Sequence, residues 1–288
     1  MLPENVPPNM RLLSFNSTIL DTAVSYTAYL PKGYHDDQRM RYPVIYLLPG
    51  MAGDCRAFGK QVEAYELGMR EKDCPPAIII GVQAVYGSYY TDARDGGRPI
   101  ESVIVRELVE RVDNVFRTIP DREHRAIEGF AMGGWGAAHL AFKYPDVFGA
   151  VSIFSAPIGT FDFFLQENAS IVADVWGNDR SYFDENDPFV LASKNRDALN
   201  GRTKIRLYCG DKDRYAVLTE DMHRQLDALG IAHEFKLVRD ADREFPKVWS
   251  GVGMRVMTFW KDAFPPYVPP PPETRPATTR AAPKEAMP

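Results

Sequence analysis

One short stretch of this chain has residue types and spacing that could do chemistry. Residues 129–133 read Gly-Phe-Ala-Met-Gly. They overlap the end of an apolar run, residues 124–130, and a helical pattern begins at Gly133. A strand that enters a helix through two closely spaced glycines makes a strained turn, and a serine at its centre can attack a carbonyl carbon. The central residue here is Ala131, whose methyl group cannot act as a nucleophile.

Strands and helices that alternate along the chain must position this turn. Continuous apolar runs indicate strands buried on both faces, and amphipathic stretches indicate helices. Their alternation predicts an α/β fold with a mainly parallel sheet and helices on both faces. The expected parallel strands are residues 43–48, 77–82, 124–130, 150–154, 203–209 and 233–238, preceded by an antiparallel pair at 11–19 and 23–30. The expected helices are residues 57–70, 101–116, 133–143, 217–229 and 249–264.

Three further segments complete the expected domain organisation. Residues 83–99 form a long polar and aromatic connection, and a loop of that length is usually functional or mobile. Residues 155–199 are irregular and aromatic-rich, so we expect a cap over the carboxyl edge of the sheet. One domain is expected over residues 1–264. Residues 265–288, dense in Pro, Thr and Ala, are expected to be a disordered tail.

Composition and charge limit the function classes. The chain has 288 residues, of which 45% are hydrophobic and 25% charged, as is typical of a globular domain. Its net charge of −5, without a long Lys/Arg block, argues against nucleic-acid binding. No apolar run approaches the roughly 18 residues that span a bilayer, and the first residues lack a secretion-signal pattern. We expect a cytoplasmic protein that binds a small-molecule ligand and no membrane, with homodimer formation left open.

The cysteines and histidines predict neither a disulfide framework nor a metal site. Cys55, Cys74 and Cys209 are odd in number and lack metal-ligand spacing, so buried free thiols are expected. The five histidines show no H-x-E or H-x-x-x-H spacing. We therefore expect no metal and no cofactor.

Three segments, in order, resemble one known family. They are residues 46–53 (Tyr-Leu-Leu-Pro-Gly-Met-Ala-Gly), residues 129–149, and residues 209–213 (Cys-Gly-Asp-Lys-Asp) before a helix. Over roughly residues 10–264 the chain is similar to the esterase D and antigen 85 branch of the α/β-hydrolases, the "putative esterase" family that also contains feruloyl esterases. The resemblance implies an α/β-hydrolase fold in which the turn at Ala131 is the nucleophile elbow.

The resemblance also implies where a catalytic triad would lie, and two of its three positions are replaced. The serine position is Ala131, and the acid is retained as Asp213. The histidine position falls on Arg243, or on Glu244 if the loop shifts by one residue. Pro49 replaces a further histidine, that of the family's YLLHG motif. Three independent losses indicate a naturally remodelled site.

Other parts of the family's site do not depend on the lost side chains. The resemblance implies an oxyanion hole made of the backbone N–H groups of Met51 and Met132, which can stabilise an alkoxide or enolate. Asp213 could act as a general base or an orienting acceptor, and Arg243 could bind an anion or polarise a carbonyl group. The alternative is a structural salt bridge between Asp213 and Arg243.

Aromatic side chains are concentrated in segments expected at the mouth of the pocket. An aromatic lining favours a flat, apolar or polycyclic ligand, and ordinary packing under long loops is the alternative. The candidate ligand-binding residues are Tyr86, Tyr89, Tyr90, Trp135, Trp176, Tyr182, Tyr215 and Glu244.

These observations support three hypotheses. The favoured one is an enzyme that uses the oxyanion N–H groups and Asp213 for addition, elimination, cyclisation or C–C coupling on a small molecule. The second is a pseudoenzyme that binds a ligand or a protein partner. The third is weak ester hydrolysis by a displaced nucleophile such as Cys55, which would be mostly protonated at neutral pH. His139, His223 and His233 are interpreted as core or surface residues.

Overall fold

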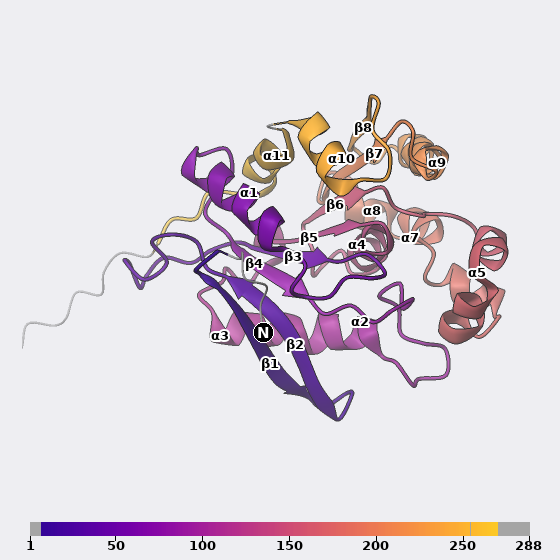
Figure 1. The fold of residues 1–288 in the computed structure, drawn as a ribbon, viewed down its shortest axis with the longest axis horizontal. Coiled ribbons are helices and arrows are strands. Elements are labelled where there is room, and N and C mark those ends of the chain that lie inside the picture. Colours follow the sequence, from indigo (N-terminus) through magenta and orange to yellow (C-terminus); the bar gives the residue numbers. More distant parts are fainter. Residues whose placement is uncertain (1–6, 254, 270–288) are drawn as a thin grey trace, which may run out of the picture.

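A computed structural model describes residues 7–253 and 255–269 of the chain. Eight strands form one sheet in the order β1-β2-β4-β3-β5-β6-β7-β8, with helices on both faces (Figure 1). β2 pairs antiparallel with β1 and β4, and the other neighbouring strands are parallel, which confirms the predicted sheet. The strands are β1 (Met10–Ser17), β2 (Thr22–Tyr29), β3 (Val44–Leu48), β4 (Ile78–Val82), β5 (Arg125–Phe130), β6 (Ala150–Phe154), β7 (Lys204–Gly210) and β8 (Glu234–Val238).

Alternate residues of the buried strands supply two separate cores, one on each face of the sheet. On β3, Tyr46 and Leu48 pack in the core that holds α3, α4 and α9, whereas Ile45 and Leu47 pack under α1, α10 and α11. The helices are α1 (Gly59–Arg70), α2 (Ile100–Ser102), the π-helix η1 (Val103–Leu108), α3 (Val109–Val115), the 3-10 helix η2 (Arg122–His124), α4 (Met132–Lys143), α5 (Phe161–Trp176), α6 (Arg180–Asp184), α7 (Pro188–Lys194), α8 (Arg196–Leu199), α9 (Ala216–Ala228), α10 (Phe245–Val252) and α11 (Arg255–Ala263).

The segment expected to be an irregular cap is largely helical. Residues 155–199 contain α5, α6, α7 and α8, which lie together at one end of the sheet (Figure 1). Side chains of Thr160, Asp179 and Asp187 accept hydrogen bonds from the first turns of α5, α6 and α7. These N-caps satisfy backbone N–H groups that would otherwise lack partners, so short helices form where the hydrophobic periodicity is weak.

The last expected helix is divided in two. Residues 249–264 were predicted as one helix, but α10 ends at Val252 and α11 begins at Arg255. Gly253 between them has φ 69° and ψ −147°, a conformation that interrupts a helix and that glycine adopts readily. The expected helix at residues 101–116 is continuous, although its Val103–Leu108 part is a π-helix.

A buried ion pair crosses the middle of the sheet. Glu128, Ser152 and Arg206 are register partners on β5, β6 and β7. Arg206 Nη2 lies 2.9 Å from Glu128 Oε2, and Arg206 Nε donates to Ser152 Oγ at 2.7 Å. Tyr65 of α1 donates to Glu128, and Arg206 donates to the Val256 carbonyl of α11. The pair therefore joins three strands to two helices.

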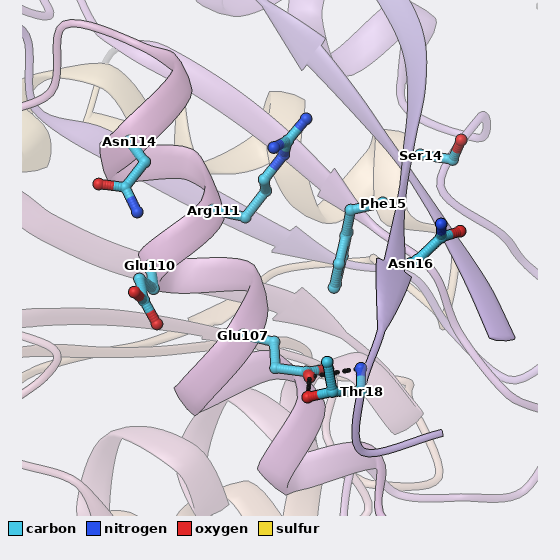
Figure 2. A pocket seen from close by; sticks show the side chains of 8 residues that line it. All are labelled: Ser14, Phe15, Asn16, Thr18, Glu107, Glu110, Arg111 and Asn114. Carbon is cyan, nitrogen blue, oxygen red and sulfur yellow. Dashed lines mark hydrogen bonds between the residues drawn. The ribbon is translucent and has the colours of Figure 1, made fainter. Parts of the chain in front are cut away.

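The antiparallel hairpin is attached to the helix that follows residues 83–99. Glu107 of η1 accepts hydrogen bonds at 2.8 Å from the N–H and at 2.6 Å from the hydroxyl of Thr18, at the end of β1 (Figure 2). A hollow of about 690 Å³ lies between this part of the hairpin and α3. None of the helices in the described part of the chain combines the length and apolar composition needed to cross a bilayer.

The start of the expected tail is docked on the domain. The Pro265 carbonyl lies 3.0 Å from Nε2 of His124, just before β5. Residues 270–288, which make up most of the segment predicted to be disordered, lie outside the described residues.

Candidate functional site

The turn at Ala131 has the strained geometry predicted for it. Ala131 is the N-cap residue of α4 with φ 54° and ψ −121°, and its N–H donates to the Phe154 carbonyl at 3.0 Å. A Cβ atom on Gly129 would overlap the carbonyl of Gly133, so this close passage of strand and helix requires glycine. A non-glycine residue with such a backbone is typically strained by about 1–3 kcal/mol. The turn therefore keeps a strained conformation although its side chain is only a methyl group.

A cavity of about 540 Å³ lies over Ala131. Its walls come from the segments that follow β3, β5, β6, β7 and β8, together with Tyr89 and the first half of α5. These segments meet at the carboxyl edge of the parallel strands, where folds of this class bind ligands. The larger hollow beside the hairpin lies elsewhere, and its Glu107 is already engaged by Thr18 (Figure 2). The cavity at Ala131 is therefore the candidate site.

The described residues that line this cavity include no serine, threonine, cysteine or histidine. Acyl-enzyme chemistry needs a hydroxyl or thiol nucleophile and usually an imidazole base, so this lining does not support it. Cys55, the alternative nucleophile, is fully buried and does not line the cavity. Burial raises the pKa of its thiol to about 11, which keeps it protonated at neutral pH.

Two backbone N–H groups that the sequence predicts to form an oxyanion hole have no backbone partner among the described residues. Met51 and Met132 both line the cavity beside Ala131. A Cβ atom on Gly50 would lie 3.7 Å from the Ala131 methyl carbon, which shows how closely the two loops approach. Among the backbone hydrogen bonds of the described residues, none uses the N–H of Met51 or Met132. Both donors are therefore available to an oxygen atom of a ligand.

Tyr215 links two arginines at the rim of the cavity. Its hydroxyl oxygen accepts hydrogen bonds from Arg214 Nη2 at 2.9 Å and from Arg243 Nη1 at 3.1 Å. Arg214 also forms an ion pair with Glu167 of α5. All four residues line the cavity. Because the two guanidinium groups occupy the lone pairs of the hydroxyl oxygen, the Tyr215 O–H itself is left to donate.

Asp213 lies beneath this rim and does not line the cavity. Its side chain is only 5% exposed, and Oδ1 accepts the N–H of Tyr215 at 2.9 Å. Oδ2 is buried and has no hydrogen-bond partner among the described residues. The expected alternative of a salt bridge with Arg243 is not among the ion pairs found in the described ranges. Tyr215 stands between the two groups, since its N–H binds Asp213 and its hydroxyl binds Arg243.

The structure places Arg243, and not Glu244, in the cavity. Arg243 lies with its guanidinium over the Tyr215 ring, 5.3 Å from the ring centroid. Glu244 is the N-cap residue of α10, is exposed, and pairs with Lys247 at 3.2 Å. Glu244 was a candidate ligand-binding residue, and this position directs it to solvent.

The aromatic candidates divide into three groups. Tyr89 and Tyr215 line the cavity. Tyr86 is 68% exposed, and the Tyr182 hydroxyl donates to the Asp92 carbonyl. Three more are fully buried in the core and are absent from the lining, namely Tyr90, Trp135 and Trp176.

Two contacts explain why these rings are internal. Tyr90 packs where a Cβ atom on Gly136 would overlap its ring, and its hydroxyl donates to the Pro49 carbonyl at 2.7 Å. Trp135 and Trp176 pack against each other with centroids 5.9 Å apart. Ordinary packing, the alternative considered from the sequence, accounts for them.

Several lining residues were not found from the sequence. Phe163 and Phe164 begin α5, Phe130 ends β5, and Arg214 and Glu167 form the ion pair at the rim. The only signal for Arg214 was its position directly after Asp213. The phenylalanines carried no signal, because their position depends on how α5 folds over the sheet.

Comparison with known families agrees with this geometry. A sequence model of the family described as "Putative esterase" matches residues 17–269. An esterase of Mycobacterium tuberculosis is 28% identical over 155 residues, which cover 52% of this chain and 33% of that protein. The chain thus matches only about a third of that relative's length. An acetyl esterase of Caldicellulosiruptor saccharolyticus is 25% identical over 240 residues, which cover 76% of this chain and 86% of the relative.

Solved structures show the same fold. A ferulic acid esterase superposes with a TM-score of 0.76 at 23% identity, covering 89% of this chain and 98% of the other. An S-formylglutathione hydrolase of Staphylococcus aureus superposes with a TM-score of 0.72 at 21% identity, covering 87% and 98%. At these identities the likeness establishes the α/β-hydrolase fold.

Proposed function

Since this chain belongs to the "putative esterase" family, we propose that it is an enzyme of that fold which acts on a small aromatic carbonyl compound without an acyl-enzyme intermediate. The observation that carries the proposal is the lining of the cavity at Ala131. Two free backbone N–H groups and the Tyr215 hydroxyl meet there without a serine, threonine, cysteine or histidine among the described lining residues. The reaction class is an addition, elimination, cyclisation or C–C coupling in which negative charge develops on a carbonyl oxygen.

The backbone donors stabilise that charge. A carbonyl oxygen held beside Ala131 accepts hydrogen bonds from the N–H groups of Met51 and Met132, and these bonds strengthen as the oxygen becomes an alkoxide or enolate. Loss of one such donor in other enzymes costs about 10²–10³-fold in rate. The strained backbone of Ala131 supports this role, because strain of this kind persists mainly at functional sites.

Tyr215 supplies the proton in this proposal. Its O–H donates to the developing anion, and the phenolate that remains is stabilised by the guanidinium groups of Arg214 and Arg243. Asp213 acts through Tyr215, since its carboxylate accepts the Tyr215 N–H and fixes the loop. Asp213 is therefore assigned the orienting role, one of the two roles considered from the sequence, and is a positioning residue in this proposal.

Aromatic side chains define the ligand class. Tyr89, Phe163 and Phe164 line the cavity with ring surfaces, which favour a flat aromatic group. Arg243 matches the geometry of a carboxylate. Two structures of this fold were solved with such compounds: a ferulic acid esterase of Anaeromyces mucronatus with ferulic acid, and a serine-to-alanine mutant of a Clostridium thermocellum feruloyl esterase module with sinapinate. Ferulate and sinapinate are therefore suitable binding probes.

The test compares metabolite profiles of the source organism after deletion of the gene and complementation by variants. We expect a compound to accumulate in the deletion strain and to disappear with the wild type or with Tyr86→Phe, which removes an exposed hydroxyl outside the cavity. With Tyr215→Phe the compound should persist, while the purified variant still binds ferulate. A metabolite profile that the deletion leaves unchanged, or equal rescue of the deletion strain by Tyr215→Phe, would contradict the proposal. Either result would indicate a pseudoenzyme that binds a ligand.

Ester hydrolysis is the second candidate, and the relatives favour it because several of them are described as esterases. The described lining offers no serine, threonine or cysteine as a covalent nucleophile, so we expect hydrolysis to proceed by direct attack of water. Purified protein should turn over p-nitrophenyl acetate no faster than buffer. Turnover that co-purifies with the chain and persists in Cys55→Ala would establish hydrolysis by this route.

A further inference from the structure

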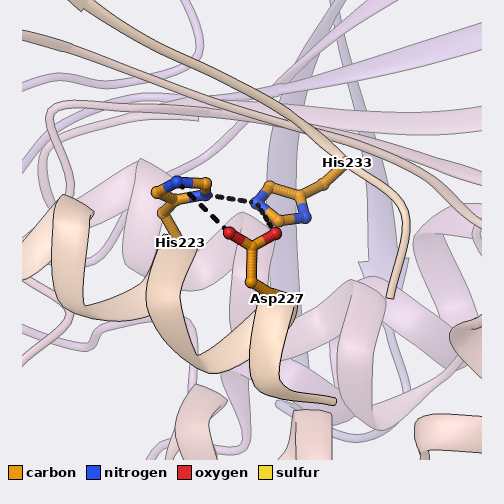
Figure 3. A group of neighbouring side chains, drawn as sticks. All are labelled: His223, Asp227 and His233. Atoms are coloured by element: carbon orange, nitrogen blue, oxygen red, sulfur yellow. Dashed lines mark hydrogen bonds and ion pairs between the residues drawn. The ribbon is translucent and has the colours of Figure 1, made fainter. Parts of the chain in front are cut away.

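Two histidines and an aspartate converge at the C-terminal half of α9, and none of them lines the cavity. His223 and Asp227 lie one turn apart on α9, and His233 lies just before β8 (Figure 3). His223 Nδ1 is 2.8 Å from His233 Nε2, and the Asp227 carboxylate oxygens lie 3.4 Å from His223 Nε2 and 4.0 Å from His233 Nε2. One donor atom from each residue falls within 4.8 Å of the other two.

The geometry of the two imidazoles brings acceptor atoms close together in this cluster. The Ile231 carbonyl, 2.8 Å from His233 Nδ1, can only accept, so neutral His233 has its proton on Nδ1 and a lone pair on Nε2. If His223 has its proton on Nδ1, its Nε2 lone pair faces the Asp227 carboxylate. If the proton is on Nε2, two lone pairs face each other at 2.8 Å. In either tautomer a lone pair of His223 faces another acceptor, an arrangement that a bound cation would satisfy.

We propose that His223, Asp227 and His233 bind a divalent transition-metal ion, with Zn²⁺ as the best match. Two imidazole nitrogens and a carboxylate oxygen are a common Zn²⁺ donor set, with ligand distances of about 2.0–2.2 Å, and the donor atoms here already lie within 4.8 Å of one another. Asp227 is 63% exposed, which leaves the fourth ligand position to water.

The surroundings are those of a metal ligand set. Histidine ligands typically donate their second N–H to a backbone carbonyl, and His233 does so to Ile231. The His223 ring stacks on Phe235 of β8, with centroids 4.1 Å apart and planes at 7°, which fixes its orientation. The sequence predicts no metal site because its histidines do not form the pairs with fixed spacing that are typical of metal ligands. This set instead joins an i, i+4 pair on a helix to a histidine beyond the next turn.

The ion would connect the C-terminal half of α9 to the start of β8. None of the three residues lines the cavity at Ala131, so the effect is on stability and the proposal is independent of the proposed function. A ligand that binds only the folded chain raises the melting temperature, by roughly 5 °C when free Zn²⁺ is about 100-fold above Kd.

The test is titration of the chelator-stripped full chain with Zn²⁺, read by calorimetry and by thermal unfolding. We expect one Zn²⁺ per chain and a higher Tm. His223→Ala and Asp227→Asn should each weaken affinity at least about 10-fold. Two controls should bind as the wild type: Asp221→Asn, on the same helix, and His35→Ala, an exposed histidine elsewhere.

Two outcomes would overturn the proposal. One is a wild-type Tm that Zn²⁺ does not change. The other is a Zn²⁺ affinity that does not change in Asp227→Asn, which is an isosteric substitution at an exposed position. That result would show that the ion binds elsewhere. Asp227→Asn keeps the test valid if His223→Ala fails to fold.

Discussion

Ala131 holds a backbone conformation that its own side chain does not require. The positive φ of this residue lifts a side chain over the sheet, which serves a serine nucleophile but gives no benefit to a methyl group. Met51 and Met132 line the cavity beside Ala131, and the N–H of neither has a backbone partner among the described residues. Retention of the turn without the hydroxyl therefore fits selection for the backbone donors.

The sequence predicts that Asp213 and Arg243 occupy the acid and histidine positions of a triad, which leads to the first testable prediction. Asp213 Oδ2 is a buried acceptor without a partner among the described residues, as expected of a carboxylate whose histidine has been replaced. We expect the double variant Ala131→Ser, Arg243→His to hydrolyse p-nitrophenyl acetate at least about 100-fold faster than Ala131→Ser alone, the usual contribution of a general base. Equal rates in the two variants would show that residue 243 does not reach the histidine position.

At the scale of elements, the row formed by Glu128, Ser152 and Arg206 joins β5, β6 and β7 to the helices above them. Both charged side chains are almost completely buried, at 1% and 0% exposure. Such a pair adds little over an apolar replacement, but removal of one partner leaves a buried charge.

The second prediction concerns this pair. Arg206→Met should lower the free energy of unfolding by about 3–5 kcal/mol, because the Glu128 carboxylate is left without its counter-ion. The double variant Glu128→Gln, Arg206→Met should recover much of that loss. Urea unfolding of the two variants and the wild type measures this, and strictly additive effects would contradict the coupling.

A second buried carboxylate, that of Glu101, makes the free energy of unfolding depend on pH. Burial opposes ionisation of Glu101, but His139 and Lys143, each 2.7 Å from its oxygens, outweigh burial and hold the pKa of Glu101 at about 2. A depressed pKa in the folded state stabilises the fold above the unfolded value near 4.5, and this contribution is lost as the pH falls toward 2.

The third prediction follows from that sign. Glu101→Gln should cost roughly 3 kcal/mol of unfolding free energy at pH 7, with the difference from wild type shrinking between pH 5 and pH 2. Urea unfolding at pH 7 and pH 3 measures it. Asp197→Asn, at a 95% exposed carboxylate, is the control and should show no such trend. A difference that stays constant with pH would show that Glu101 acts through packing alone.

At the scale of the whole molecule, the three cysteines report on global unfolding. Cys55, Cys74 and Cys209 are free and buried, as predicted. Burial raises their thiol pKa values to about 11, 12 and 12, so reactive thiolate is scarce in the folded chain. We expect a thiol reagent to label none of them at pH 8 in buffer and all three in urea. Rapid native labelling of one cysteine would reveal local opening at that position.

The sequence by itself determined the order of strands and helices, the leading antiparallel pair, the strained turn at Ala131 and the family. These depend on local chemistry: the apolar runs form strands, the glycines permit the turn, and the segment motifs identify the family. The same information identified Met51, Met132, Tyr89, Tyr215 and Arg243, because each lies directly after a strand or in a loop at the carboxyl edge of the sheet.

Tertiary structure alone decided which side chains share a space. The aromatic side chains of Trp135 and Trp176 suggested a ligand pocket, but both pack in the core. Which face of a helix or loop becomes buried depends on the elements that pack against it. Asp213 and Arg243 are separated by Tyr215, a contact that sequence spacing does not encode. The histidine cluster forms because the turn between α9 and β8 brings His233 next to His223. Local sequence periodicity does not predict which side chains such a turn brings together.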